Sequence, residues 1–151
     1  MPPLSPSPNA YGYPLLIKHL LAGSQLASAS QEIVSGTEMR LSYADLGQRV
    51  RQLANSLKAS GIREGMRVGV MDWDTHRYLE CFFAIPMMGA SLFTINVRLS
   101  PAQVLYTINH GKSDLIIVHR DFMPLIDDIK SGFDRDIIIV PIGDGEGYEE
   151  W

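Results

Sequence analysis

The segment from Met71 to Pro101 constrains the fold most, because it changes from strand to helix to strand with almost no residues between. An apolar run ends at Met71, a helical pattern covers Thr75–Met88, and a second strand-like run covers Ser91–Ile95. Strands that alternate with helices form parallel sheets through right-handed crossovers. The sequence therefore predicts an α/β fold in which helices cover both faces of a parallel sheet.

The same alternation continues on either side of this segment. Strands are predicted over Arg67–Met71, Ser91–Ile95, Asp114–Val118 and Asp136–Val140, and the last two are apolar runs typical of strands covered on both faces. Ile33-Val34 and Met39–Leu41 flank Ser35-Gly36-Thr37, which predicts a small β-hairpin before the sheet. Further helices are predicted over roughly 14–22, opened by Pro14, and over 42–61, 100–109 and 121–130.

Capping residues mark several helix ends. Ser42 with Asp45, and Ser100 with Gln103 after Pro101, fit capping boxes. Asp121 is predicted to cap the short helix that follows it. Gly61 and Gly111 are predicted to end their helices. Pro86 is expected to kink or end its helix near the last turn.

Composition limits the possible classes of protein. The chain has 151 residues, 46% of them hydrophobic and 20% charged, which suits a soluble domain with a real core. The net charge is −4 and the basic residues form no stripe, so no nucleic-acid partner is expected. No apolar stretch reaches the roughly 18 residues of a transmembrane helix, so no transmembrane segment is expected.

The N-terminus and the cysteine content suggest a location. Residues 1–12 are rich in Pro and Ser and are predicted to be a disordered lead, with residues 13–151 forming the folded part. That lead lacks the charged head and apolar run of a signal peptide. Cys81 is the single cysteine and can form no internal disulfide, so we expect a cytoplasmic protein. Because Cys81 lies in a Phe-rich helix, it is interpreted as a buried, inert thiol.

Polar residues follow three of the predicted strands, at the edge where α/β sheets bind ligands. These residues are Asp72-Trp73-Asp74, Asn96-Val97-Arg98 and His119-Arg120. The two aspartates could bind a metal or a phosphate, but Asp74 could equally cap the next helix. Arg98 could bind an anion or pair with a neighbouring acid. The four histidines lack metal-ligand spacing, so no zinc site is expected.

Candidate phosphate loops do not meet the requirements of such a loop. Gly111-Lys112-Ser113 copies the end of a Walker motif, but Tyr106 replaces its first glycine and the segment follows a helix instead of a strand. The stretch 143–147 is glycine-rich but carries carboxylates, and it is predicted to begin a loop over 143–150. Met87 and Met88 are interpreted as residues that fill gaps in the core. The residues alone therefore indicate an α/β domain without an evident catalytic site.

Several motifs resemble those of the AMP-forming acyl-CoA synthetases, in the adenylate-forming superfamily. Leu41-Ser-Tyr-Ala-Asp-Leu46 is similar to their first core motif, and Pro86–Asn96 to their second. The segment 61–70 resembles the family's approach to its first sheet strand, with Met66 where an Asp is usual. Asp72–His76 together with Phe83–Pro86 resembles the medium- and long-chain fatty-acid–CoA ligases. The resemblance covers roughly residues 30–130.

This resemblance implies an N-terminal fragment of a larger adenylation domain. The parent enzyme would convert ATP, fatty acid and coenzyme A (CoA) into acyl-CoA, AMP and pyrophosphate, with Mg²⁺ shielding the phosphates. The ATP-binding part and the C-terminal lid of such enzymes have no counterpart in residues 13–151. No catalytic, cofactor-binding or metal-binding residue is therefore assigned, and the chain alone is expected to be inactive. Related ligases are typically homodimers, so a homo-oligomer is expected.

Two other interpretations remain open from the sequence. The chain could be a standalone, non-catalytic binding or dimerisation module derived from the same family. It could also be a receiver-like signalling domain, because it has βα alternation and acidic residues after a strand. A receiver needs an Asp after its third strand and a Lys after its fifth, and His119 and Pro141-Ile142-Gly143 supply neither.

Overall fold

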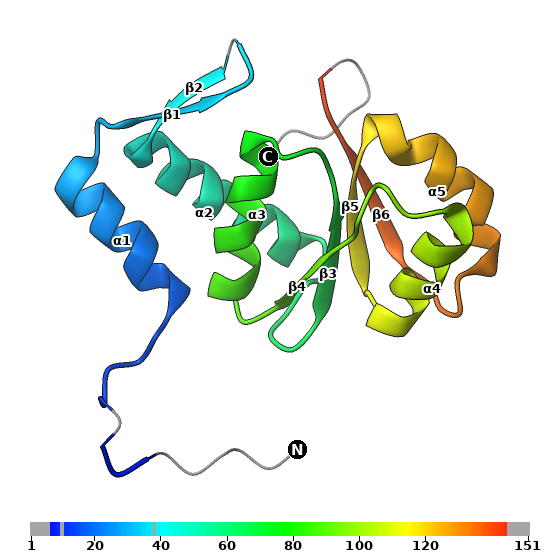
Figure 1. The fold of residues 1–151 in the computed structure, drawn as a ribbon, viewed down its shortest axis with the longest axis horizontal. Helices are drawn as coiled ribbons and strands as arrows, with labels where there is room; N and C mark the ends of the chain where they lie inside the picture. The colour runs from blue at the N-terminus through cyan, green and yellow to red at the C-terminus, as the bar shows by residue number, and fades with distance from the viewer. Residues whose placement is uncertain (1–6, 10, 38, 145–151) are drawn as a thin grey trace.

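A parallel sheet forms the centre of the molecule (Figure 1). The structure is a computed structural model that describes residues 7–9, 11–37 and 39–144. Within these residues four parallel strands pair in the order β4-β3-β5-β6. They are β3 (Arg67–Met71), β4 (Ser91–Thr94), β5 (Leu115–His119) and β6 (Ile138–Ile142). The predicted parallel α/β fold is confirmed, and the strand boundaries differ from the prediction by at most two residues.

Helices cover both faces of the sheet (Figure 1). One face is covered by α2 (Tyr43–Ala59) and α3 (His76–Met87), and α1 (Ile17–Ser28) packs against these two helices. The other face is covered by α4 (Pro101–Gly111) and α5 (Met123–Ile129). Short 3₁₀ turns, Arg120–Phe122 and Lys130–Gly132, flank α5. Each face therefore has its own hydrophobic core.

The apolar run of β5 serves both cores at once. Leu115 and Ile117 point to the α2–α3 core, whereas Ile116 and Val118 point to the α4–α5 core. Successive side chains on a strand point to opposite faces, so a strand covered on both faces needs an uninterrupted apolar sequence. The prediction of a fully buried strand is confirmed here.

The same prediction is wrong for β6. Its residues Ile138–Pro141 are only partly buried, and Ile138 is 47% exposed. The reason is position, because β6 pairs with β5 on one side and forms an edge of the described sheet. A run of apolar letters cannot distinguish a central strand from an edge strand.

A hairpin precedes the sheet, as predicted. Strands β1 (Glu32–Ser35) and β2 (Met39–Ser42) pair in antiparallel fashion. The Ser35 hydroxyl accepts a hydrogen bond of 3.2 Å from the His76 backbone N–H, so the hairpin contacts the first turn of α3.

Both predicted capping boxes are present. The Ser42 hydroxyl accepts from the Asp45 N–H, and the Asp45 carboxylate accepts from the Ser42 N–H. Ser100 and Gln103 make the same reciprocal pair at the start of α4. These caps satisfy N–H groups that would otherwise lack partners.

The predicted end of α2 is also confirmed. Gly61 has a φ of +92°, and the Ile62 N–H donates to the Leu57 carbonyl at 3.0 Å. This is a Schellman end, which requires a left-handed residue at the glycine position.

The first helix begins and ends later than predicted. It starts at Ile17 with Leu16 as its N-cap, so Pro14 does not open it, and it continues to Ser28. Packing explains the extension, because the Gln25 side chain lies where a side chain at Gly47 of α2 would otherwise be. Leu21 is buried in the same interface.

The end of α4 also differs from the prediction. Gly111 is the last helical residue, and the left-handed position falls on Lys112, with a φ of +52°. A Cβ on Gly111 would lie 3.0 Å from the Phe93 ring. Gly111 is therefore explained by close packing on β4, and not by backbone conformation.

Three smaller predictions are corrected. Asp121 does not cap α5, because the His119 Nδ1 accepts the Asp121 N–H and α5 starts only at Met123. Met87 is 42% exposed and does not fill the core, whereas Met88 packs against the core as predicted. Pro86 lies in the last turn of α3, as expected.

Two predicted segments lie largely outside the described residues. Of the lead 1–12, residues 7–9, 11 and 12 are described and belong to no helix or strand. Of the predicted loop 143–150, only Gly143 and Asp144 are described.

Candidate functional site

The candidate site is a crevice at the carboxyl ends of β3 and β4. The loop after β3 leads to α3 on one face, and the loop after β4 leads to α4 on the other. Loops that diverge from neighbouring strands in this way open a crevice, which is where α/β sheets bind ligands. A cavity of about 270 Å³ lies here, lined by 72–74, Tyr78 and 94–98.

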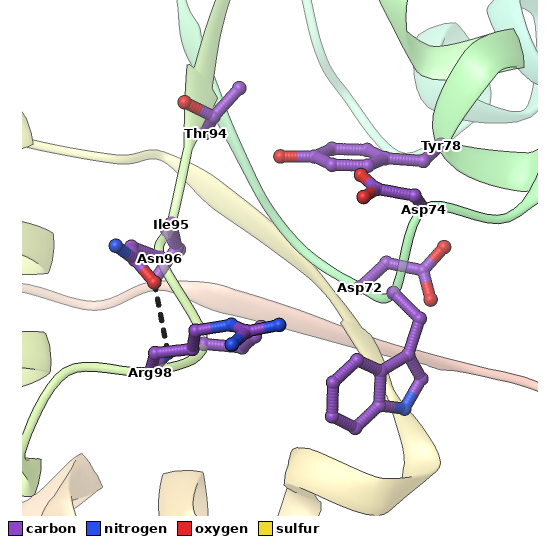
Figure 2. A pocket seen from close by; sticks show the side chains of 9 residues that line it. Asp72, Asp74, Tyr78, Thr94, Ile95, Asn96 and Arg98 are labelled. Carbon is purple, nitrogen blue, oxygen red and sulfur yellow. Dashed lines mark hydrogen bonds between the residues drawn. The ribbon is translucent and has the colours of Figure 1, made fainter.

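The structure brings together two of the three polar segments singled out in the sequence. Asp72-Trp73-Asp74 and Asn96-Val97-Arg98 face each other across this cavity. Figure 2 shows the Tyr78 phenol directed from α3 toward β4, and the Arg98 side chain extending toward the loop after β3. The Asn96 Oδ1 accepts a hydrogen bond of 2.9 Å from the Arg98 backbone N–H and so holds the turn that carries the arginine.

Asp72 is a buried carboxylate at the base of this loop, with only 5% of its surface exposed. Its Oδ2 accepts a hydrogen bond of 2.6 Å from the Thr75 hydroxyl, while its Oδ1 has no hydrogen-bond partner among the described residues. Burial raises the pKa of Asp72, and the Thr75 hydrogen bond and the His119 and Arg77 charges only partly oppose this. The carboxylate is thus tied to the turn before α3.

Asp74 is exposed and does not cap α3, so the capping interpretation is wrong. The N-cap is Thr75, whose side chain donates to Asp72 instead of accepting from the helix. The pKa of Tyr78 is raised, first by burial and then by the negative charge of Asp74. Asp74 therefore keeps the Tyr78 phenol protonated.

The third predicted segment, His119-Arg120, does not line the cavity. It belongs to a neighbouring network around Asp121, whose Oδ2 accepts from the Trp73 Nε1–H at 2.9 Å and lies 3.4 Å from the His119 Nδ1. Arg120 donates to the Asp144 backbone carbonyl. The segment therefore connects the loop after β3 to the residues that follow β6.

Two buried ion pairs were not predicted from the sequence. Arg49 of α2 binds Glu80 of α3 at 2.6 Å, and Arg77 of α3 binds Asp144 at 2.8 Å. Glu80 is fully buried, and Arg77 nearly so. The predicted apolar face of α3 was Tyr78, Phe82 and Ile85, but the buried face is His76, Arg77, Glu80, Cys81, Ala84 and Ile85.

A signal for this face was present in the sequence. Cys81 and Ala84 are the small residues of α3, and small side chains let a helix lie close to a sheet. The bulkier Phe82 is 41% exposed on the outside. Cys81 is fully buried, and burial raises its thiol pKa, which agrees with the predicted inert thiol.

The described residues do not fit ATP phosphates or Mg²⁺. Asp72 and Asp74 would repel phosphates at the crevice, and Gly111-Lys112-Ser113 lies at the C-terminal, negative end of α4. No group of three His, Cys, Asp or Glu residues that could hold a metal occurs within 7–9, 11–37 and 39–144. We therefore derive no catalytic step through ATP or Mg²⁺ at this site.

In the part of the chain that the structure describes, no helix has both the length and the apolar character of a membrane span.

Comparisons with known proteins identify the family. Residues 25–148 match the family described as AMP-binding enzyme. A long-chain-fatty-acid–CoA ligase of Thermus thermophilus is 38% identical over 104 residues, which are 66% of this chain and 19% of the relative. A 3-methylmercaptopropionyl-CoA ligase of Ruegeria lacuscaerulensis is 32% identical over 117 residues, 75% of this chain and 22% of the relative.

Solved structures agree with these relatives. The anthranilate CoA ligase AuaEII, in complex with anthranoyl-AMP, superposes with a TM-score of 0.80 at 28% identity, covering 90% of this chain and 26% of that protein. A fatty acyl CoA synthetase of Mycobacterium tuberculosis has the same fold, with a TM-score of 0.74 at 24% identity, covering 83% of this chain and 26% of that protein.

The chain spans about a fifth of the length of these curated relatives. The comparisons favour neither the receiver-like interpretation nor the standalone module, and the sequence resemblance to AMP-forming acyl-CoA synthetases is confirmed. The chain belongs to the AMP-binding enzyme family.

Proposed function

We propose that this chain is the N-terminal, structural portion of a fatty-acid–CoA ligase. The observation that carries the proposal is the 38% identity to a long-chain-fatty-acid–CoA ligase over 104 residues. In the complete enzyme, the fatty-acid carboxylate would attack the α-phosphate of ATP and release pyrophosphate. The CoA thiol would then displace AMP from the acyl-adenylate.

We assign no catalytic, cofactor-binding or metal-binding residue to this chain. ATP, Mg²⁺ and CoA would be bound by parts of the ligase that this chain does not contain. The poor fit of the crevice to phosphates and Mg²⁺ supports this assignment. In this proposal residues 13–151 provide the four strands and the hairpin on which the rest of the large domain packs, in a cytoplasmic enzyme.

The acid substrate is tested with the product of the longest reading frame that contains the chain. Pyrophosphate release is measured with ATP, Mg²⁺ and a panel of acids: octanoate, palmitate, 3-methylmercaptopropionate and 4-hydroxybutyrate. We expect the two fatty acids to give the highest kcat/KM. A preference for either of the other acids would contradict the fatty-acid assignment, and release with none would contradict the ligase assignment.

We also propose that the chain self-associates through α1 and α3. These helices expose the large apolar side chains Leu20, Leu26, Phe82 and Met87. Contiguous apolar surface of this kind usually lies in interfaces. Light scattering after size exclusion should give twice the chain mass, and Phe82→Glu should reduce it. A monomer at micromolar concentration would refute this proposal.

A further inference from the structure

An apolar groove lies beside the outer edge of β6, on the face that α2 covers. Leu53 and Leu57 of α2 line it together with Val140 and Pro141 of β6, and Ser56 and Ser60 contribute hydroxyls. Its volume is about 210 Å³. Small-molecule pockets typically measure roughly 300–1,000 Å³, so this groove suits protein side chains better than a free ligand.

The edge of β6 is poorly suited to another strand. The Ile138 N–H donates to the Asp114 carbonyl at 3.2 Å, so the main chain of Ile138 and Val140 faces β5 and that of Ile139 and Pro141 faces outward. Proline has no N–H, so a strand added at this edge would lack one donor in its ladder. Side chains packed into the groove would cost no such hydrogen bond.

The chain leaves β6 toward the same face as the groove. Beyond Ile142, the Asp144 carboxylate accepts from the Arg77 guanidinium at 2.8 Å, and Arg120 donates to the Asp144 carbonyl. Arg77 belongs to α3, which lies beside α2 on one side of the sheet (Figure 1). These contacts direct the following residues to the α2–α3 side.

The residues that follow have a composition that matches this groove. Segment 145–151 reads Gly-Glu-Gly-Tyr-Glu-Glu-Trp and carries two large aromatic side chains, Tyr148 and Trp151. Its three glutamates complement α2, which carries Arg49, Arg51 and Lys58 after its capping acid. Buried Tyr and Trp rings usually keep a partner for their polar atom, and the groove offers two serine hydroxyls.

The length of the segment is also sufficient. Asp144 lies three residues beyond Pro141, about 10 Å at the rise of a strand. Seven residues reach at most about 25 Å when extended, so 145–151 can return to the level of Val140.

We propose that residues 145–151 fold back into this groove and place Tyr148 and Trp151 between α2 and β6. The groove thus binds the chain's own aromatic segment, and α2 and β6 are joined on the side where the sheet has no further strand among the described residues. This inference does not depend on the acid that the enzyme activates.

The test follows the fluorescence of Trp151 in the complete 151-residue chain. Trp73→Phe removes the other tryptophan, and circular dichroism confirms that this background folds. Ser56→Phe fills the groove, and Asn55→Phe is the matched control, because Asn55 is exposed on α2 and does not line the groove. Acrylamide quenching and the emission maximum are measured for the three proteins.

We expect blue-shifted emission and several-fold weaker quenching in the background and in Asn55→Phe, and loss of both in Ser56→Phe. Equal, strong quenching in all three proteins would overturn the proposal. So would protection that survives Ser56→Phe, which would place Trp151 elsewhere. Protection that disappears on dilution together with a dimer would assign the groove to a second copy. The measurement uses no acid, ATP or CoA, so its failure is distinct from failure of the proposed function.

Discussion

At the scale of single residues, the buried pair of Arg49 and Glu80 carries more of the stability than any exposed pair. Glu80 is fully buried and the Arg49 side chain is 17% exposed, whereas Arg40 and Glu32 are each more than half exposed. Removing one member of a buried pair typically costs about 3–5 kcal/mol, and an exposed pair contributes about 0–1 kcal/mol. Arg49→Met should therefore lower the urea midpoint strongly, and Arg40→Met very little. Equal effects would contradict the burial of Glu80.

Asp72 gives a prediction about pH. Because burial raises its pKa, the folded state holds the proton more tightly than the unfolded state. The destabilising effect of the ionised Asp72 is absent below its unfolded pKa and is complete above its folded pKa. Asp72→Asn should therefore be more stable than the parent at neutral pH, and the difference should vanish on acidification. Urea midpoints across pH test this, and a variant that is less stable at neutral pH would show that Arg77 and His119 outweigh burial.

The two capping serines give a second stability prediction. Ser42→Ala and Ser100→Ala should each cost about 1 kcal/mol, because each leaves a helix N–H without its partner. Ser131→Ala is the control, since this exposed serine makes no cap. Denaturation midpoints for the three variants measure the effect. No loss at Ser42 and Ser100 would mean that the caps contribute nothing in solution.

At the scale of elements, local signals predicted most of the fold. Capping boxes located the starts of α2 and α4, and alternating apolar runs located all four strands of the described sheet. The errors arise from tertiary contacts. The Gln25–Gly47 contact extends α1, and the edge position of β6 leaves it partly exposed. Neither contact can be read from neighbouring residues.

The candidate site was predicted in part for the same reason. Parallel strands bring their carboxyl ends together, so Asp72 and Arg98 could be assigned to one crevice. The exclusion of His119 and the inclusion of Tyr78 depend on which way the loops turn after each strand. The pairs of Arg77 and Glu80 were missed because a charged residue on a helix is usually exposed.

The end of α4 tests this view of tertiary influence. Lys112 occupies a left-handed conformation that costs roughly 1–2 kcal/mol for a residue with a side chain, whereas glycine adopts it freely. Lys112→Gly should therefore raise stability by about 1 kcal/mol. Gly111→Ala should lower it by roughly 1–3 kcal/mol, because the new methyl group meets the Phe93 ring. Thermal denaturation of both variants decides this, and the reverse order would place the left-handed residue at Gly111.

At the scale of the whole molecule, the chain combines a family fold with a crevice that does not suit the family's cofactors. Residues 25–148 match the AMP-binding enzyme family, yet the crevice presents carboxylates where phosphates would need N–H groups or cations. A structural role is consistent with both observations. The rest of the adenylation domain would then supply the groups that bind ATP.

The most direct test of this account is pyrophosphate release by the 151-residue chain itself. The purified chain is incubated with ATP, Mg²⁺ and palmitate, beside a no-protein blank and the Thermus thermophilus ligase as positive control. The account predicts release from the Thermus enzyme and none above the blank from the chain. Palmitate-dependent release by the folded chain would contradict it, because the described residues would then have to bind and activate ATP.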